Sequence, residues 1–397
     1  RLLLEFWLSK FSKVKPEKLE PAVRIALLLA MYQITMLDKI PPRAAVNESV
    51  NLARRNSKNP RSPTLVNGIL RSFCRAQENL PQPDDLATRY SHPQWLVDLL
   101  SQEIPAAELE SLLASNNAEP PTTIQTNTMK TTPEALEKRL KEEGVTAEKM
   151  VCADMPELNY ACMISGFDHL NALESFREGL FYVQDVSSMM AAHLADPKPG
   201  DQVLDLCAAP GGKSLHAADK MRNQGCVEAR DLTEYKVDLI RENVQRAGVS
   251  CVVPKVKDAE QLDAEWIGKA DVVIADLPCT GYGVIGRKPD IKYYASKEKE
   301  EELVRIQRAI LANAASYVKP GGTLLYSTCT VNRKENGENA AWFLEQFPFE
   351  AVSLDELLPD ELKSGETAKG QLQLIPGVHK TDGFFLAKFR KTEKGRA

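Results

Sequence analysis

The sequence predicts an α/β protein in which an all-α module and a small α+β subdomain precede a mostly parallel sheet with an antiparallel last strand. From Phe181 onward, short apolar runs alternate with helical patterns, which is typical of a parallel sheet covered by helices on both faces. Residues 1–80 carry helical patterns throughout. Asp382-Gly383 follows an apolar stretch and precedes the last strand, which indicates a chain reversal.

The length of 397 residues suits two or three domains, because domains commonly run to ~100–200 residues. We expect a helical domain at 1–82, linker helices with a small α+β subdomain at 83–178, and the α/β domain at 179–397. The composition, 43% hydrophobic and 26% charged, is typical of a globular protein. The apolar run at 25–31 is shorter than the ~20 residues of a membrane span. No signal-peptide pattern is present, and we expect a cytoplasmic monomer without membrane contact.

The first module is expected to contain four helices and a cationic surface. Helical spacing places them around residues 2–11, 25–32, 45–55 and 65–73, with Pro41-Pro42 as a break. Residues 1–80 hold 14 Lys and Arg against 6 Asp and Glu, a net charge of +8. The remaining residues hold 36 against 49, a net charge of −13, and the two values sum to −5. This asymmetry indicates a polyanionic partner such as RNA or DNA, although an ordinary solvated helical surface would show it too.

The middle of the chain begins with a linker at 81–85 and continues with a helical section at 93–115. Residues 122–129 alternate like a strand, and Thr132 and Pro133 open a charged helix that runs to Glu143. The α/β part then shows five strands and five helices. The strands are expected at 202–206, 226–229, 271–275, 322–327 and 384–389, and the helices at 185–195, 214–223, 234–247, 299–317 and 335–346.

A glycine-rich turn follows the strand at 202–206 and is the first candidate binding site. Two glycines let the backbone approach a ligand, and the following helix, with Ser214 as its expected N-cap, offers free N–H groups. A phosphate-binding P-loop would need glycine at position 207, where this chain has cysteine, and G-x-G-x-x-G is absent. Asp231, twenty residues after Gly211, suits a ribose hydroxyl. A surface glycine turn in an unrelated α/β protein remains the alternative.

Two cysteines follow the ends of two further strands. Cys279 comes shortly after the strand at 271–275, together with Asp276, and Cys329 comes shortly after the strand at 322–327. Ligands of open α/β sheets bind beyond the carboxyl ends of the strands, so each thiol is a candidate nucleophile. Asp258 follows a third strand end, where it could close over a ligand base. Taken singly, each cysteine is more often a buried small apolar residue.

The eight cysteines form no C-x-x-C pair, so we expect no metal site and reduced thiols. No histidine lies near Cys279 or Cys329 in the sequence, which disfavours a papain-like hydrolase. A thiolate and a carboxylate beside a ribose-binding turn suit methylation of a pyrimidine. Thiolate addition at carbon 6 makes carbon 5 nucleophilic, and a carboxylate at ring N3 makes the base more electrophilic. The base must leave its stack to reach such a site.

The motifs together resemble the S-adenosylmethionine-dependent RNA cytosine C5-methyltransferases of the NOL1/NOP2/Sun family. The resemblance rests on residues 207–213 (CAAPGGK), 276–281 (DLPCTG) and 327–330 (STCT), with further segments at 183–188 and 382–385. Residues 32–33, 37–39, 45–48 and 67–71 resemble the NusB-like domain of the bacterial branch that methylates 16S ribosomal RNA. The resemblance implies a Rossmann-like methyltransferase domain, S-adenosylmethionine as cofactor and 16S rRNA as partner. Relative to that NusB-like domain, we expect the first helices to be missing.

The family roles transfer to matching positions. Cys329 would be the nucleophile that bonds to carbon 6, Cys279 would assist proton removal or enzyme release, and Asp276 would sit between cofactor and base. Asp231 would bind the ribose of the cofactor and Asp258 its adenine region. Thr280 and Thr330 stand where serine is common and keep the hydroxyl group. The cofactor loop would consist of Cys207, Ala208, Ala209, Pro210, Gly211, Gly212 and Lys213.

Three alternatives stay open from the sequence. The same chemistry could act on transfer RNA, although the NusB-like module favours ribosomal RNA. A non-catalytic RNA-binding or antitermination factor could keep the fold, although both cysteines are present. A hydrolase is the third alternative.

Overall fold

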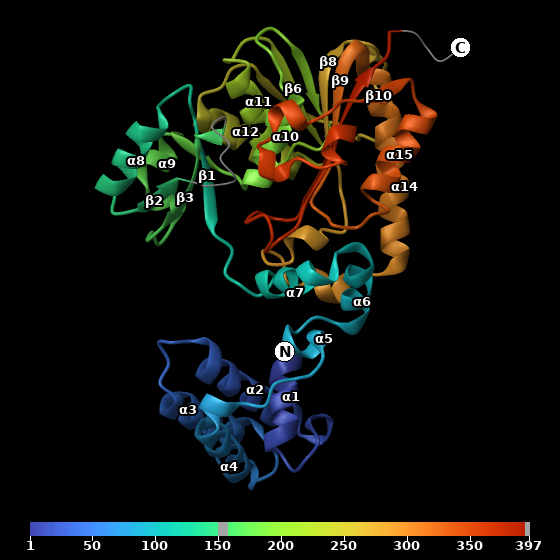
Figure 1. Cartoon of the computed structure of the whole chain (residues 1–397). Helices are drawn as coiled ribbons and strands as arrows, with labels where there is room; N and C mark the ends of the chain where they lie inside the picture. Colours follow the sequence, from blue (N-terminus) through green and yellow to red (C-terminus); the bar gives the residue numbers. More distant parts are fainter. Residues whose placement is uncertain (150–157, 394–397) are drawn as a thin grey trace. The chain divides into compact units, whose positions relative to one another are not determined.

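The computed structural model describes residues 1–149 and 158–393, and the chain divides into two compact units, Arg1–Gln102 and Glu103–Ala397 (Figure 1). Within these described ranges, no helix combines the length and the apolar character that a membrane span requires. Cys152 lies outside the described residues, and the other seven cysteines are free thiols.

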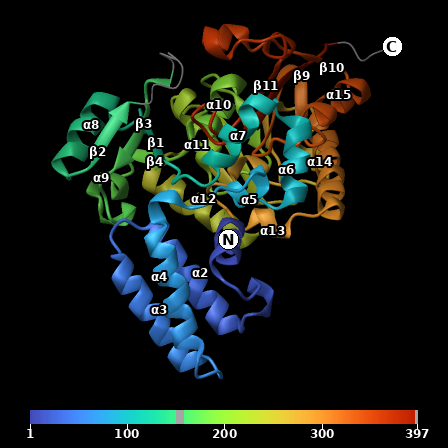
Figure 2. The same ribbon diagram turned by 60° about the horizontal axis from the view of Figure 1, so that its bottom comes forward.

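The first unit contains the four helices expected from the sequence. They are α1 (Leu2–Phe11), α2 (Pro21–Met36), α3 (Pro42–Asn56) and α4 (Ser62–Arg75), followed by the short α5 (Leu86–Arg89) and by α6 (Gln94–Glu103). Figure 2 shows α2, α3 and α4 side by side. Their apolar faces meet in a core that includes Trp7, Leu27, Met31 and Phe73. Prolines in the first turns of α2 and α3 suit positions where a backbone N–H has no partner in the helix.

The second unit begins with α7 (Ala106–Ser115) and a small antiparallel sheet. Pro105 at its N-cap separates α7 from α6 in the helical section expected at 93–115. The sheet contains β1 (Thr122–Thr126), β2 (Thr146–Lys149), β3 (Ala161–Ser165) and β4 (Phe181–Val183), in the order β2-β3-β1-β4. The helices α8 (Pro133–Glu142) and α9 (Glu174–Arg177) accompany it, and the side chain of Thr132 caps α8 as expected. Ile124, Leu140 and Phe181 lie in the core of this α+β subdomain.

The large sheet confirms the expected α/β architecture. Its order is β10-β12-β9-β8-β5-β6-β7, with β11 paired to β12. The pairs from β9 to β7 are parallel, and β12 is antiparallel to β9, β10 and β11. The antiparallel last strand follows the reversal at Asp382-Gly383, as the sequence predicts. The strand bounds are β5 (Gln202–Asp205), β6 (Cys226–Asp231), β7 (Val252–Val256), β8 (Ala270–Asp276), β9 (Val318–Thr328), β10 (Phe349–Ala351), β11 (Gln371–Leu374) and β12 (Phe384–Lys391).

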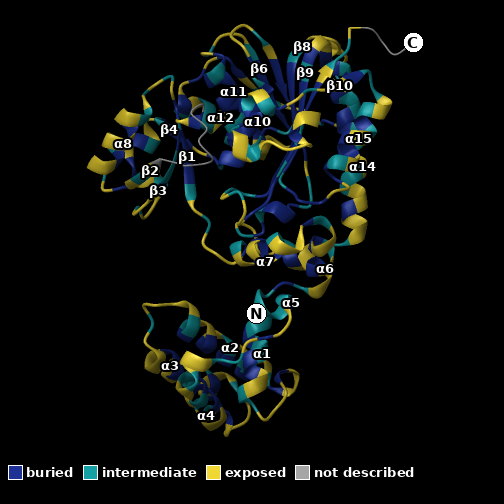
Figure 3. Cartoon of the chain, in the orientation of Figure 1, coloured by how far each residue is buried: buried dark blue, intermediate teal, exposed yellow. Residues whose placement is uncertain are grey.

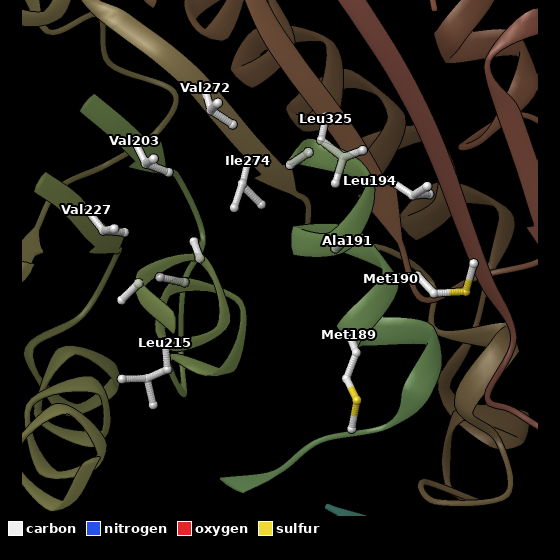
Figure 4. Packing of buried hydrophobic residues seen from close by; sticks show 14 of the residues in the cluster. Met189, Met190, Ala191, Leu194, Val203, Leu215, Val227, Val272, Ile274 and Leu325 are labelled. Atoms are coloured by element: carbon white, nitrogen blue, oxygen red, sulfur yellow. The ribbon is translucent and has the colours of Figure 1, made fainter. Parts of the chain in front are cut away.

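Helices cover both faces of this sheet. The helices α10 (Val186–Ala195), α11 (Gly212–Lys220) and α12 (Glu234–Ala247) pack on one face, and α14 (Lys297–Tyr317) and α15 (Gly337–Gln346) pack on the other. A short α13 (Ile291–Tyr294) precedes α14. Side chains alternate along each strand, so that Val203, Val272 and Leu325 face α10 and α11 (Figure 4). Figure 3 shows the strands buried and the outer helix faces exposed. The strand ends are therefore held between two packed helix layers.

Two expectations about the α/β part were wrong or incomplete. α11 starts at Gly212 and not at Ser214, because Gly211 turns the chain with a φ of +108° and occupies the N-cap. Ser214 is not a cap; its Oγ donates to the buried Oδ2 of Asp205 at 2.6 Å. The short strands β10 and β11 were not expected as strands. The strand that was expected to end before Asp258 is β7.

Candidate active site

A cavity of about 370 Å³ lies at the carboxyl ends of β5, β8 and β9. The N-terminus of α10 and the start of β12 complete its walls. The sheet order places β5, β8 and β9 side by side, so residues distant in sequence meet here. Its lining includes Ala209, Gly212, Lys213, Asp276, Cys329 and Phe384.

The glycine-rich turn forms the β5 side of the cavity. Ala208, Ala209, Pro210 and Gly212 line it, and the backbone N–H of Ala209 donates to Oδ2 of Asp231 at 3.1 Å. The carbonyl of Pro210 accepts from Nδ2 of Asn243 at 2.8 Å, which ties the turn to α12. The first turn of α11 begins at this wall, so its unpaired backbone N–H groups are near the cavity.

The two candidate thiols lie next to each other. Sγ of Cys279 and Sγ of Cys329 are 3.2 Å apart, although the residues are 50 positions apart in sequence. The hydrogen bond from Cys279 lowers the pKa of Cys329 against the opposing effect of burial, and the charges of Lys213 and Lys288 lower it further. The same hydrogen bond, together with burial, raises the pKa of Cys279 well above its usual range. Cys329 is therefore the more acidic thiol of the pair.

An ion pair stands beside the thiols. Nζ of Lys213 lies 2.6 Å from Oδ2 of Asp276, and both side chains are largely buried. Oδ1 of Asp276 accepts from Oγ of Ser327 at 2.8 Å, which fixes the carboxylate between β8 and β9. Burial alone would lower the pKa of Lys213, but the charge of Asp276 and the hydrogen bond to it outweigh burial and raise that pKa. Lys213 also lies 5.4 Å from the centre of the Phe384 ring.

A buried network behind the thiols fixes the two loops that carry them. Oγ1 of Thr280 and Oγ1 of Thr330 are 2.8 Å apart, so the hydroxyls that follow the two cysteines bond to each other. The carboxylate of Glu335 accepts from the backbone N–H of Thr280 at 2.9 Å and from its hydroxyl at 2.5 Å. Gln307 donates to the same carboxylate at 2.9 Å and to the carbonyl of Pro278 at 2.8 Å. Burial raises the pKa of Glu335.

A charged wall closes the other side of the cavity. Nε of Arg287 donates to Asp382 at 2.6 Å, and Nη2 of Arg287 donates to Asp185 at 3.3 Å. Asp185 also caps α10 through the backbone N–H of Ser187 at 2.9 Å. Burial and the neighbouring charge of Asp185 raise the pKa of Asp382 to about 6.

The structure brings some of the expected site residues into the cavity and leaves others outside its lining. Ala208, Ala209, Pro210, Gly212, Lys213, Asp276 and Cys329 line it. Cys279 is not part of the lining, but its sulfur contacts that of Cys329. Cys207 faces the core instead, and burial raises the pKa of its thiol. Gly211 forms the turn behind the lining.

Asp231 and Asp258, the expected ribose and adenine residues, are not part of this lining. Asp231 is buried and bonds to the backbone of Ala209 and to Lys236, whose Nζ lies 3.0 Å from it. Asp258 accepts from the backbone N–H of Glu260 at 2.9 Å and from Nε2 of Gln261 at 3.1 Å. Asp231 thus shapes the glycine-rich turn, whereas Asp258 organises the loop after β7.

Other lining residues carried no chemical signal in the sequence interpretation. Asp185, Arg287, Lys288 and Asp382 are charged residues in ordinary loop contexts, and only the fold brings them together. Gln184 lines the cavity and has a buried Oε1 without a hydrogen-bond partner. The segments at 183–188 and 382–385, which resembled family segments, contain three of these five residues. That resemblance was the signal that could have identified them.

Three family models match the chain. The model described as 16S rRNA methyltransferase RsmB/F matches residues 192–390, and the NusB family model matches residues 1–75. A model of the ferredoxin-like domain of RsmF/B-like methyltransferases matches residues 92–163.

Relatives and solved structures agree with these matches. The probable ribosomal RNA small subunit methyltransferase B of Bacillus subtilis is 38% identical over 98% of this chain and 87% of its own length. The ribosomal RNA small subunit methyltransferase B of Klebsiella pneumoniae is 33% identical over 98% and 86%. A methyltransferase homolog protein from Pyrococcus horikoshii has a TM-score of 0.66 at 28% identity, over 77% of this chain and 98% of its own. NSun6 from the same organism, solved with SFG, shares the fold at a TM-score of 0.67 and 23% identity, over 76% and 99%.

Proposed function

The chain belongs to the 16S rRNA methyltransferase RsmB/F family, and from this premise we propose that it transfers a methyl group from S-adenosylmethionine to carbon 5 of a cytosine in 16S rRNA. Cys329 forms a transient covalent bond to carbon 6 of that base. The observation that carries the proposal is that Cys329 lines the same cavity as the Lys213–Asp276 ion pair, with the sulfur of Cys279 3.2 Å from its own.

The two thiols differ in acidity, because the pKa of Cys329 is lowered and that of Cys279 is raised, and this difference suits a two-step covalent reaction. The Cys329 thiolate attacks carbon 6 of the cytosine, and the ring electrons move so that carbon 5 becomes nucleophilic. Once carbon 5 has bonded to the methyl group, its proton is removed, the double bond between carbons 5 and 6 re-forms, and the bond between Sγ and carbon 6 breaks. Cys279, whose Sγ lies 3.2 Å from Sγ of Cys329, assists proton removal or release of the enzyme.

Asp276 is placed to orient the base. Its carboxylate is held by Ser327 and by Lys213, and it lines the cavity with Cys329. A proton shared between this carboxylate and ring N3 increases the electrophilicity of carbon 6. The cation of Lys213 also favours the thiolate form of Cys329. Asp276 therefore serves the base, and Lys213 serves both the Asp276 carboxylate and the nucleophile.

The glycine-rich turn fits a nucleoside-type cofactor. Gly211 adopts a left-handed φ, and Ala208 to Gly212 expose backbone at the start of α11, where a ligand can approach closely. We assign cofactor binding to Ala208, Ala209, Pro210, Gly212 and Lys213, with Asp231 as the acceptor for a ribose hydroxyl and Asp258 near the adenine. S-adenosylmethionine, when bound, supplies an electrophilic methyl group on a sulfonium sulfur.

Methyl transfer from labelled S-adenosylmethionine to 16S rRNA tests the proposal. We expect the Cys329→Ala variant to lose methyl transfer and covalent adduct together, because the thiolate that attacks carbon 6 has been removed. The Cys279→Ala variant should form the adduct and accumulate it on a denaturing gel, because release is impaired. Cys226→Ala serves as the matched control, since Cys226 is a partly exposed thiol at the opposite end of β6.

Two results would refute parts of the proposal. Full activity of Cys329→Ala would refute the nucleophile, and absence of an adduct with Cys279→Ala would refute its role in release. Mapping the methyl group to any position other than carbon 5 of cytosine would refute the chemistry. Transfer RNA is included as a competing substrate, and preferential methylation of transfer RNA would refute the assigned substrate.

A further inference from the structure

A second cavity, of about 240 Å³, adjoins the active-site cavity and shares Asp185, Arg287 and Asp382 with it. We propose that this second cavity, which we call the flanking cavity, binds the nucleotide next to the target cytosine in single-stranded RNA. The inference rests on the function proposed above and extends it to the sequence context that the enzyme reads. The flanking cavity would hold the base and the phosphate of that neighbouring nucleotide while the target cytosine reacts.

The walls of the flanking cavity are built by tight backbone contacts. Segments 115–121, 283–287 and 376–382 meet there. Oγ of Ser111 donates to the carbonyl of Gly377 at 2.9 Å, and a Cβ at position 377 would lie 2.5 Å from the carbonyl oxygen of Ser111. The backbone N–H of Gly383 donates to the carbonyl of Gly283 at 2.8 Å. The cavity is therefore formed before any ligand arrives, as is usual for binding sites.

The wall between the two cavities is fixed by one guanidinium group. Arg287 donates to Asp382 at 2.6 Å, to Asp185 at 3.3 Å and to the carbonyl of Pro121 at 3.3 Å. The backbone N–H of Asp382 donates to Asp185 at 3.2 Å. Because both cavities share this wall, a base held in one of them leaves the adjacent nucleotide within reach of the other.

The lining has the chemistry of a nucleotide site. Lys380 is exposed and lines the flanking cavity, where it supplies a cation. A cation there suits the phosphate. Pro120 and Pro376 offer apolar faces to a ring, and Glu119 offers a carboxylate to an exocyclic amine. A flipped target base leaves its neighbours unstacked, and unstacked bases are the parts of RNA that proteins read by contact.

The test uses a 16S rRNA fragment that the wild-type protein binds, made intact or with an abasic ribose on either side of the target cytosine. For the wild-type protein, we expect one of the two abasic substrates to lose at least about fivefold in kcat/KM, the low end for loss of one stacked base. Glu119→Ala should reduce that penalty, because the base no longer has its partner. Lys380→Ala should raise KM without changing kcat and should lower the salt slope of binding by about one.

Lys369→Ala is the matched control, an exposed lysine of the same unit outside both cavity linings. Each variant is compared with the wild-type protein under conditions in which both bind S-adenosylmethionine equally well. An equal penalty for both abasic substrates, a penalty unaffected by Glu119→Ala, or a KM and salt slope unaffected by Lys380→Ala overturns the flanking cavity. Fluorescence anisotropy with the same RNAs separates the two proposals. If Glu119→Ala reduces the effect of the abasic ribose on binding but no RNA is methylated, the cytosine chemistry is refuted and the flanking cavity is supported.

Discussion

The acidity of Cys329 depends on its neighbours more than on its own exposure. The thiol is largely buried, which opposes ionisation, but the hydrogen bond from Cys279 and the cation of Lys213 favour the thiolate. Removing the donor should therefore raise the pKa of Cys329. This effect can be measured on the free protein, without RNA or cofactor.

We expect Cys279→Ala to shift the alkylation of Cys329 by iodoacetamide to higher pH, because the thiolate is the reactive form and its fraction rises through the pKa. Cys279→Ser keeps a hydroxyl donor at the same place and should shift the profile less. The rate at Cys329 is followed by peptide mass spectrometry across a pH series. Identical midpoints in the wild-type protein and in both variants would contradict the assignment of the thiolate to Cys329.

At the scale of elements, the active site depends on a close approach between the loop after β8 and the start of β12. Gly283 and Gly383 face each other, and a Cβ at position 283 would overlap the carbonyl group of Gly383. The contact places Arg287 on the first loop against Asp382 on the second. The spacing of these two backbones therefore sets the wall of the cavity.

We expect Gly283→Ala to destabilise the protein by about 1–3 kcal/mol, because an added methyl group must push two backbones apart. Methyl transfer should fall as well, since Arg287 and Asp382 separate. Gly286→Ala is the matched control in the same loop, where the nearest atom to a new Cβ, the carbonyl oxygen of Ser115, lies 3.6 Å away. Urea unfolding of both variants measures the difference. Equal stability of the two variants would show that the close approach is dispensable.

Much of the α/β architecture could be predicted because the signals are local. The strands at 202–206 and 271–275 are apolar runs that stop at polar residues, and the helices between them show clear periodicity. The short strands β10 and β11 could not be predicted in this way, because their pairing with β12 depends on contacts across the fold. The start of α11 was placed too late, because the positive φ of Gly211 decides it rather than a side-chain cap.

The candidate site was predictable only where chemistry coincided with a strand end. Cys279 and Cys329 follow neighbouring parallel strands, so their proximity could be inferred from topology. Asp185, Arg287 and Asp382 come from three distant segments, and no local pattern relates them. Their meeting depends on tertiary contacts that periodicity does not encode. The roles assigned to Asp231 and Asp258 stay predictions until a ligand complex is measured.

At the scale of the whole molecule, charge is divided unevenly along the chain. Residues 1–80 carry a net charge of +8, and the remainder carries −13. In the first unit, Arg54 and Arg55 end α3 as exposed side chains. When RNA binds, such cationic side chains neutralise phosphates and release the counterions of the RNA. The affinity of RNA for the protein should therefore fall steeply with salt.

We expect the double variant Arg54→Ala/Arg55→Ala to bind 16S rRNA more weakly and with a shallower salt dependence. The slope of log K against log salt should decrease by about 0.7–0.9 for each phosphate that the variant no longer neutralises. Lys363→Ala/Lys369→Ala removes the same charge from the second unit and serves as the control. Equal slopes for both double variants would remove these arginines from the RNA interface.

The place of β12 in the sheet has a consequence for biosynthesis. This strand leaves the ribosome after every other strand of the sheet, yet it pairs with β9 beside Cys329 and carries Phe384 into the cavity wall. A nascent chain therefore contains Cys329 before the strand that pairs beside it is available. We expect the growing polypeptide to stay catalytically silent until residues 384–391 have cleared the exit tunnel, so that translation itself times the appearance of a working enzyme.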